Sequence, residues 1–173
     1  MALEVEMERG WEWLEDAAHD LRLTGSIAMK FIVENERSVV IMLVPESEVI
    51  NDPDLKTSVA QKVRTLVDSM DAHTVYHLSD AWTSTVNNAS QRPELIRKIE
   101  ELGIRCASDL GLIERREALM CSISTRSGEG ATLRWFYRRD GKQITMEERD
   151  RPGGAMKGRF SHLFDKGSDH DRR

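Results

Sequence analysis

Two carboxylates and their neighbouring arginines are the residues whose types and spacing could carry chemistry. Asp80 and Trp82 lie at the end of one predicted strand, and Arg115, Arg116 and Glu117 lie at the start of a later one. Consecutive strands are usually neighbours, so these side chains should meet at one edge of a sheet. Paired carboxylates can act as acid and base or bind a cation. Carboxylates saturated by arginine would instead form a structural ion-pair lock, which we favour because buried charges need partners.

Other catalytic patterns are weak in this sequence. His73 and His77 have the spacing of a helical metal pair, but their segment has the character of a strand. In a strand this spacing separates the two Cα atoms by about 13 Å, too far for one zinc ion to bridge. The sequence contains no GxSxG, P-loop or GxGxxG motif. We therefore predict neither a metal site nor a cofactor.

An arginine-aromatic segment, residues 133–139, is a possible nucleic-acid strip, because bases stack on aromatic rings with cationic flanks. Strand alternation would place Trp135 and Tyr137 on one face, and Phe136 with the arginines on the other. Of the net charge of −5, residues 151–173 carry +3, which leaves −8 on the first 150 residues. Such an acidic body disfavours binding to phosphate backbones, so a nucleic-acid partner is not expected.

The carboxylate and arginine segments also show a family resemblance. Asp80-Ala81-Trp82, Arg92-Pro93 and Arg115-Arg116-Glu117-Ala118-Leu119 resemble a pattern in a family of uncharacterised small microbial and phage-type proteins. In that family an acidic-Ala-Trp segment is followed by a variable loop with Arg-Pro and then by a strand that reads Arg-basic-Glu-Ala-Leu. The resemblance covers residues 76–125. It implies no activity, because none is established for the family.

Four further aromatic residues are candidates for contacts with a partner. Trp11 and Trp13 lie on a predicted N-terminal helix, and Phe160 and Phe164 interrupt the charged C-terminal segment. Exposed aromatic rings are common at interaction hot spots. We therefore predict a homo-oligomer with the first helix or the C-terminal segment at the contact, and a further protein partner stays open.

The periodicity of apolar residues predicts the elements that position these side chains. Steps of three and four residues indicate a helix over residues 3–21, and a second helix begins at Asp52-Pro53-Asp54, which can cap it. A third helix begins at Pro93, after a loop over residues 83–92. The predicted strands are 27–33, 38–44, 73–82, 115–125, 131–139 and 142–147.

These elements predict an α+β fold with an antiparallel sheet of about six strands, a mixed arrangement being left open. Residues 1–150 are expected to form one domain, and residues 151–173 a flexible charged tail whose deletion leaves the melting temperature nearly unchanged. The strand 38–44 is apolar on both faces, so we expect it to be central and covered on both sides.

The last three strands should form a meander with one continuous apolar face. Asp140-Gly141 is expected to form a two-residue turn that pairs Arg139 with Lys142. A turn around Ser127-Gly128-Glu129 would pair Cys121 with Trp135.

Composition restricts the functional classes. The chain has 173 residues, and it contains no apolar run long enough to span a membrane, no secretory leader pattern and only two cysteines, which indicates a cytoplasmic protein. With no catalytic motif, a self-associating, non-enzymatic binding or assembly module is favoured. The alternatives are a small metal-dependent hydrolase or nuclease-like enzyme that uses Asp80 and Glu117, and a nucleic-acid accessory protein.

Overall fold

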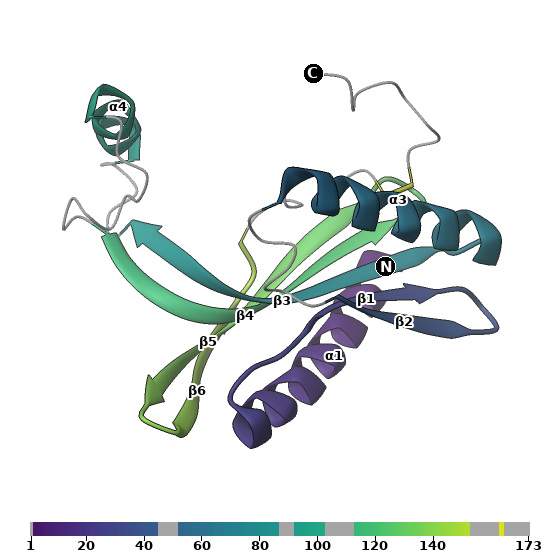
Figure 1. Ribbon diagram of the computed structural model, residues 1–173, viewed down its shortest axis with the longest axis horizontal. Coiled ribbons are helices and arrows are strands. Elements are labelled where there is room, and N and C mark those ends of the chain that lie inside the picture. Colours follow the sequence, from purple (N-terminus) through teal and green to yellow (C-terminus); the bar gives the residue numbers. More distant parts are fainter. Residues whose placement is uncertain (1, 45–51, 87–91, 103–112, 153–162, 165–173) are drawn as a thin grey trace.

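One antiparallel sheet of six strands organises the chain in the computed structural model, which describes residues 2–44, 52–86, 92–102, 113–152 and 163–164. The strand order is β2-β1-β3-β4-β5-β6 (Figure 1). The predicted α+β fold is confirmed. The elements are α1 (Ala2–Thr24), β1 (Met29–Glu34), β2 (Val39–Val44), α3 (Pro53–Met70), β3 (Thr74–Val86), α4 (Arg92–Leu102), β4 (Ile113–Thr125), β5 (Gly130–Asp140) and β6 (Gln143–Asp150).

Helices α1 and α3 cover opposite faces of the sheet (Figure 1). The first contacts β3, β4, β5 and β6, and its apolar stripe is buried against Tyr76, Leu119 and Leu133. The second packs on β1 on the other face, where Val63 and Val67 meet Phe31. Asp52 caps α3 as predicted, because its side chain accepts hydrogen bonds from the backbone N–H groups of residues 54 and 55.

Gly10 marks the closest approach of α1 to the sheet. A Cβ atom at this position would lie 2.9 Å from Leu133 Cδ1 and 3.0 Å from Ile123 Cδ1, both in buried side chains. The missing side chain therefore lets the helix backbone lie directly on β4 and β5. This close contact fixes α1 over the β3–β6 part of the sheet.

The strand β2 lies at the edge of the sheet, so the prediction of a central position for it was wrong. Four of its six residues are exposed: Val39 at 40%, Val40 at 37%, Ile41 at 49% and Leu43 at 61%. The tight hairpin pairs β2 with one side of β1, and β3 occupies the other side of β1. In the described part of the chain, β2 consequently has one neighbouring strand. An apolar sequence indicates that burial of the strand would be favourable, but it does not show that other parts of the chain bury it.

The β4–β5 hairpin keeps the predicted apolar face but shifts the predicted register by two residues. Cys121 pairs with Leu133 rather than with Trp135. The turn spans residues 126–128, and Gly128 has a φ of +87° at its last position. A three-residue hairpin loop places its left-handed residue last, which explains why the turn begins one residue earlier than predicted.

The β5–β6 turn is also displaced, by one residue. Asp140 pairs with Gln143, and Gly141-Lys142 form the turn. Gly141, with a φ of +58°, occupies the first central position, where a type II′ turn carries glycine. Ile144 and Met146 nevertheless pack on the α1 core, which was the predicted face.

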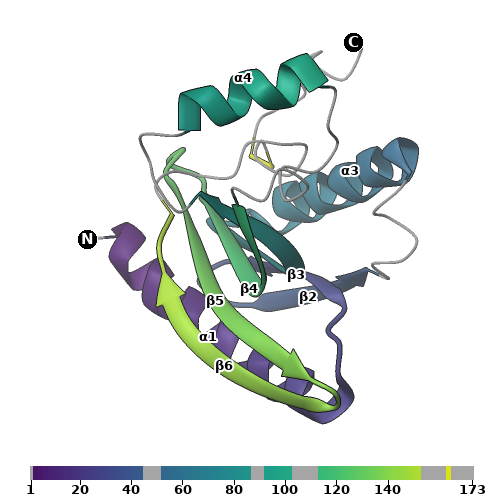
Figure 2. The ribbon, with the colours of Figure 1, turned by 90° about the vertical axis from the view of Figure 1, so that its left-hand side faces the viewer.

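Strands β3 and β4 pair along their whole length and extend beyond β5. Their pairing runs from Thr74↔Thr125 to Val86↔Ile113, whereas the pairing of β4 with β5 ends at Glu117. Residues 83–86 therefore belong to a strand, and only residues 87–91 of the predicted loop lie outside the described chain. Beyond the far ends of these strands lies α4 (Figure 2).

Part of the C-terminal segment belongs to the core. Leu163 is 2% exposed and packs in the α3 cluster, and Phe164 is half-buried against it. The other residues of this segment, 153–162 with Phe160 and 165–173, lie outside the described residues, so the predictions made for them stay predictions. A membrane-crossing helix, one that is both long and apolar enough, is not found in the part of the chain that the structure describes.

Candidate functional site

Asp80 and Glu117 lie on the α1 face of neighbouring strands and share one hydroxyl partner. The Tyr137 hydroxyl donates to Asp80 Oδ1 at 2.7 Å, and it lies 3.4 Å from Glu117 Oε1. The register places them together, because Asp80 pairs with Leu119 and Trp82 pairs with Glu117. With a side-chain period of two, all of these residues point to the same face.

Arg139 connects this polar cluster to the end of α1. Its Nε lies 3.6 Å from Glu117 Oε1, and its Nη1 donates to the backbone carbonyl of Gly25 at 2.9 Å. Gly25 follows α1 directly and has a φ of +81°. A guanidinium at the C-terminal end of a helix also compensates the negative end of the helix dipole. The cluster therefore joins β3, β4, β5 and α1.

The electrostatics of the cluster fit a structural role. Burial, together with the hydrogen bond to Asp80, raises the pKa of Tyr137, so its hydroxyl stays protonated and keeps donating. The hydrogen bond with Tyr137 raises the pKa of Arg139. The side chain of Glu117 is 17% exposed and that of Arg139 is 33% exposed. Both carboxylates thus have a partner within the protein at one of their two oxygens, as a structural lock requires.

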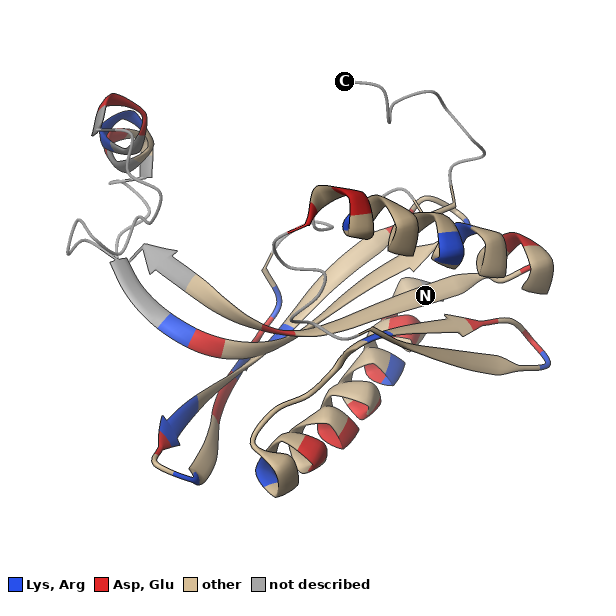
Figure 3. Cartoon of the chain, in the orientation of Figure 1, with Lys and Arg blue, Asp and Glu red and all other residues tan. Residues whose placement is uncertain are grey.

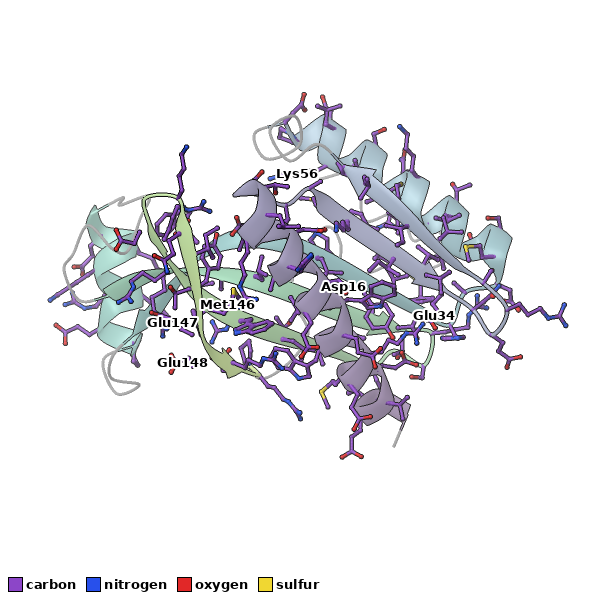
Figure 4. The ribbon with its side chains drawn as sticks, turned by 90° about the horizontal axis from the view of Figure 1, so that it is seen from below. Asp16, Glu34, Lys56, Met146, Glu147 and Glu148 are labelled. Carbon is purple, nitrogen blue, oxygen red and sulfur yellow. The ribbon has the colours of Figure 1, made fainter. Side chains whose placement is uncertain are left out.

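Arg116, the arginine that directly precedes Glu117, does not join this cluster. Arg116 lies on the opposite face, where its guanidinium is 4.1 Å from the centre of the Phe136 ring. It forms ion pairs with Glu148 and, at 2.8 Å, with Glu147. Figure 4 shows these two glutamates on β6. Arg115 belongs to β4, but its side chain lies outside the description.

Arg134 and Phe136 of the arginine-aromatic segment lie on the same opposite face, whereas Trp135 and Tyr137 lie on the α1 face. Arg134 lies 5.1 Å from the Phe136 ring centre and donates from Nε to Asp150 Oδ1 at 2.7 Å. The carboxylates of β6 therefore neutralise Arg116 and Arg134, the two arginines whose guanidinium groups lie near the Phe136 ring. Two of the cations that could flank a stacking strip for single-stranded nucleic acid are therefore already paired within the protein.

The aromatic interaction candidates have different surroundings. Trp11 packs on the α1 core, and the Arg149 guanidinium lies 5.2 Å from its ring centre and 3.8 Å from that of Trp135. Trp13 is half-buried and lines a cavity beside β2. Trp82 is 58% exposed on β3.

The cavity at Trp13 was not found from the sequence. It has a volume of about 550 Å³ and lies between α1 and the β1–β2 hairpin. In the part of the chain that the structure describes, it exists because α1 covers β3 to β6 and no helix covers the same face of the hairpin. The only sequence signal was Trp13, which falls to one side of the apolar stripe of α1.

The structure gives no support for a cysteine nucleophile at Cys121 or for a metal site among the described residues. Burial raises the pKa of the Cys121 thiol, which disfavours the thiolate that a nucleophile requires. Within the described residues, no group of three or more His, Cys, Asp or Glu side chains could hold a metal ion.

We expect Arg139→Met to lower the free energy of unfolding by about 1 kcal/mol, because its contacts with Gly25 and Glu117 are partly exposed and solvent screens such contacts. Arg138→Met is the matched control, since Arg138 is an exposed neighbour on the same strand. Urea unfolding followed by circular dichroism measures both. Equal effects would contradict the lock. So would a rise in melting temperature with Mg²⁺ or Mn²⁺ that disappears in Asp80→Asn and Glu117→Gln.

Comparisons of the chain with protein-family models, with curated protein sequences and with solved structures gave no match, so the family resemblance seen in the sequence stays a prediction.

Proposed function

We propose that this chain is a non-enzymatic assembly module that self-associates by pairing β2 with β2 of a second copy. The observation that carries the proposal is the edge strand itself, Val39–Val44, which is apolar throughout and largely exposed. An edge strand presents unpaired backbone N–H and C=O groups and is a ready template for another strand. Figure 3 shows that charged residues are absent from β2.

The opposite edge of the same sheet supports this proposal by contrast. There, β6 carries Glu147, Glu148, Arg149 and Asp150 in succession (Figure 3). Charged side chains at a sheet edge prevent pairing with other chains, a protection that β2 lacks. The difference between the two edges favours pairing at one specific edge.

Pairing of β2 with itself is geometrically consistent. A two-fold axis perpendicular to the sheet makes the two strands antiparallel and keeps each face on its own side, as an isologous contact requires. With Ile41 at the axis, Val39 of one copy lies opposite Leu43 of the other. No like charges then face each other along β2, and apolar cross-strand pairs stabilise the contact.

The same proposal places the module in the cytoplasm, where the free, buried Cys121 would stay reduced. It differs from the sequence-based expectation in its contact surface, which is β2 rather than α1 or the C-terminal segment. The enzyme and nucleic-acid alternatives have less support, because Asp80, Glu117, Arg116 and Arg134 all have partners within the protein.

Light scattering coupled to gel filtration tests this proposal. At roughly 50 μM, a concentration that detects micromolar association, we expect a mass near twice the 19.8 kDa of one chain. Ile41→Lys places two ammonium groups against each other at the axis and should give the monomer mass. Thr145→Lys, an exposed site on the other edge strand, should leave the dimer intact. A monomeric parent protein, or equal dissociation by both variants, would overturn the proposal.

A further inference from the structure

We infer that the cavity between α1 and the β1–β2 hairpin binds a small organic cation, namely an amine carried on an aromatic or branched aliphatic body. Its volume of about 550 Å³ falls within the range of about 300–1,000 Å³ that is typical of small-molecule sites. The inference does not depend on self-association, because one chain supplies the whole lining.

An apolar body is favoured by the interior of the cavity. Ile32 and Leu78 form a buried floor on β1 and β3. The walls are the Trp13 ring on α1 and the side chains of Ile41 and Leu43 on β2. A floor from the sheet and walls from two separate elements give a concave, mostly apolar site, as small ligands require.

The charge of the ligand follows from the polar groups of the rim. Asp16, His19 and Asp20 on α1 and Lys30 on β1 line it. Lys30 Nζ forms an ion pair with Asp20 Oδ2 at 2.9 Å, so these two charges cancel. The remaining formal charge is that of Asp16, an exposed carboxylate on α1 (Figure 4). Among the described residues that line it, the cavity thus combines an apolar interior with one negative charge at its mouth that has no ion-pair partner.

Trp13 adds a second preference for a cation. Trp13 lines the cavity, and its indole nitrogen is buried without a hydrogen-bond partner among the described residues. The Arg9 guanidinium lies 5.8 Å from the centre of this ring, so the ring already contacts one cation, which does not line the cavity. An ammonium group between the indole and Asp16 would gain both a cation–π contact and an ion pair. An anion of the same size would gain neither.

Phenethylamine, phenylacetate and phenethyl alcohol test the inference, because they share a ring and differ in charge. Two-dimensional ¹H–¹⁵N NMR titrations to about 10 mM detect millimolar affinity. We expect phenethylamine to give saturable shifts of the Trp13 indole signal and of amides in β1 and β2. Its affinity should exceed that of phenylacetate by about tenfold. The reason is that Asp16 attracts the ammonium group of phenethylamine and repels the carboxylate of phenylacetate.

Two variants assign the effect to this site. Asp16→Asn should weaken phenethylamine binding about fivefold and remove most of the preference over the alcohol, within the range measured for charge-assisted contacts. Glu8→Gln removes an exposed carboxylate from the same helix, outside the cavity, and should change nothing. No saturable shift, shifts located elsewhere, or equal affinity for phenylacetate would overturn the inference. Failure of dimerisation would not, because neither variant alters β2 and light scattering on the same samples reports the mass independently.

Discussion

Leu163→Ala lowers the free energy of unfolding by about 2–5 kcal/mol, the cost of removing a buried leucine side chain and leaving a cavity. Leu163 is 2% exposed in a cluster that includes Phe31, Val33 and Val67. Urea unfolding measures the change, with Leu23→Ala as the matched control because Leu23 is 71% exposed. For a chain of this length the loss corresponds to roughly 5–15 °C in melting temperature.

Truncation extends this test to the whole C-terminal segment. A chain that ends at residue 152 loses both described anchors, Leu163 and Phe164, and should be destabilised at least as much as Leu163→Ala. A chain that ends at Phe164 keeps them and should unfold close to the parent. An unchanged melting temperature after truncation at residue 152 would restore the sequence-based expectation of a dispensable tail.

Acidification from pH 7 to pH 5 should cost about 2 kcal/mol of stability through His77 alone. Burial lowers the pKa of this imidazole from its ordinary value of 6.5 to about 4. The side chain is 5% exposed and stacks on Phe31, with ring centres 4.6 Å apart. Between pH 6.5 and pH 4, His77 is protonated in the unfolded chain and neutral in the folded chain. The free energy of unfolding therefore falls as the pH falls. The loss is complete below pH 4, where both states are protonated.

Unfolding of the parent and of His77→Gln at pH 7 and pH 5 isolates this contribution. The variant should lose about 2 kcal/mol less than the parent over this interval. His19→Gln serves as control, because His19 is exposed, and it should behave as the parent. A direct NMR titration of the His77 ring covers the case in which the variant does not fold. An imidazole that titrates near pH 6.5 in the folded protein would contradict the prediction.

The candidate cluster was predictable in part. The expectation that consecutive strands are neighbours brought Asp80 and Glu117 together, and the structure has both carboxylates on one face. The role of Tyr137 was missed, although alternation already put it on the apolar face. Its hydroxyl lies at the boundary between that face and the charged cluster, and the two-residue shift of β5 determines which carboxylates it reaches.

By itself the sequence determined the local structure and the faces. The apolar stripes of α1 and α3, the Asp52 cap and the two faces of the meander depend on residues a few positions apart. Only the tertiary structure decided that β2 lies at an edge, that Arg139 reaches Gly25, and that Leu163 enters the core. The physical reason is that side chains alternate between the two faces of a strand with a period of two. A shift of the strand register by two residues leaves every side chain on the same face, and the alternation does not show which strands are neighbours. Strand order, register and long-range contacts are set by the hydrogen bonding and packing of distant segments, which no local pattern records.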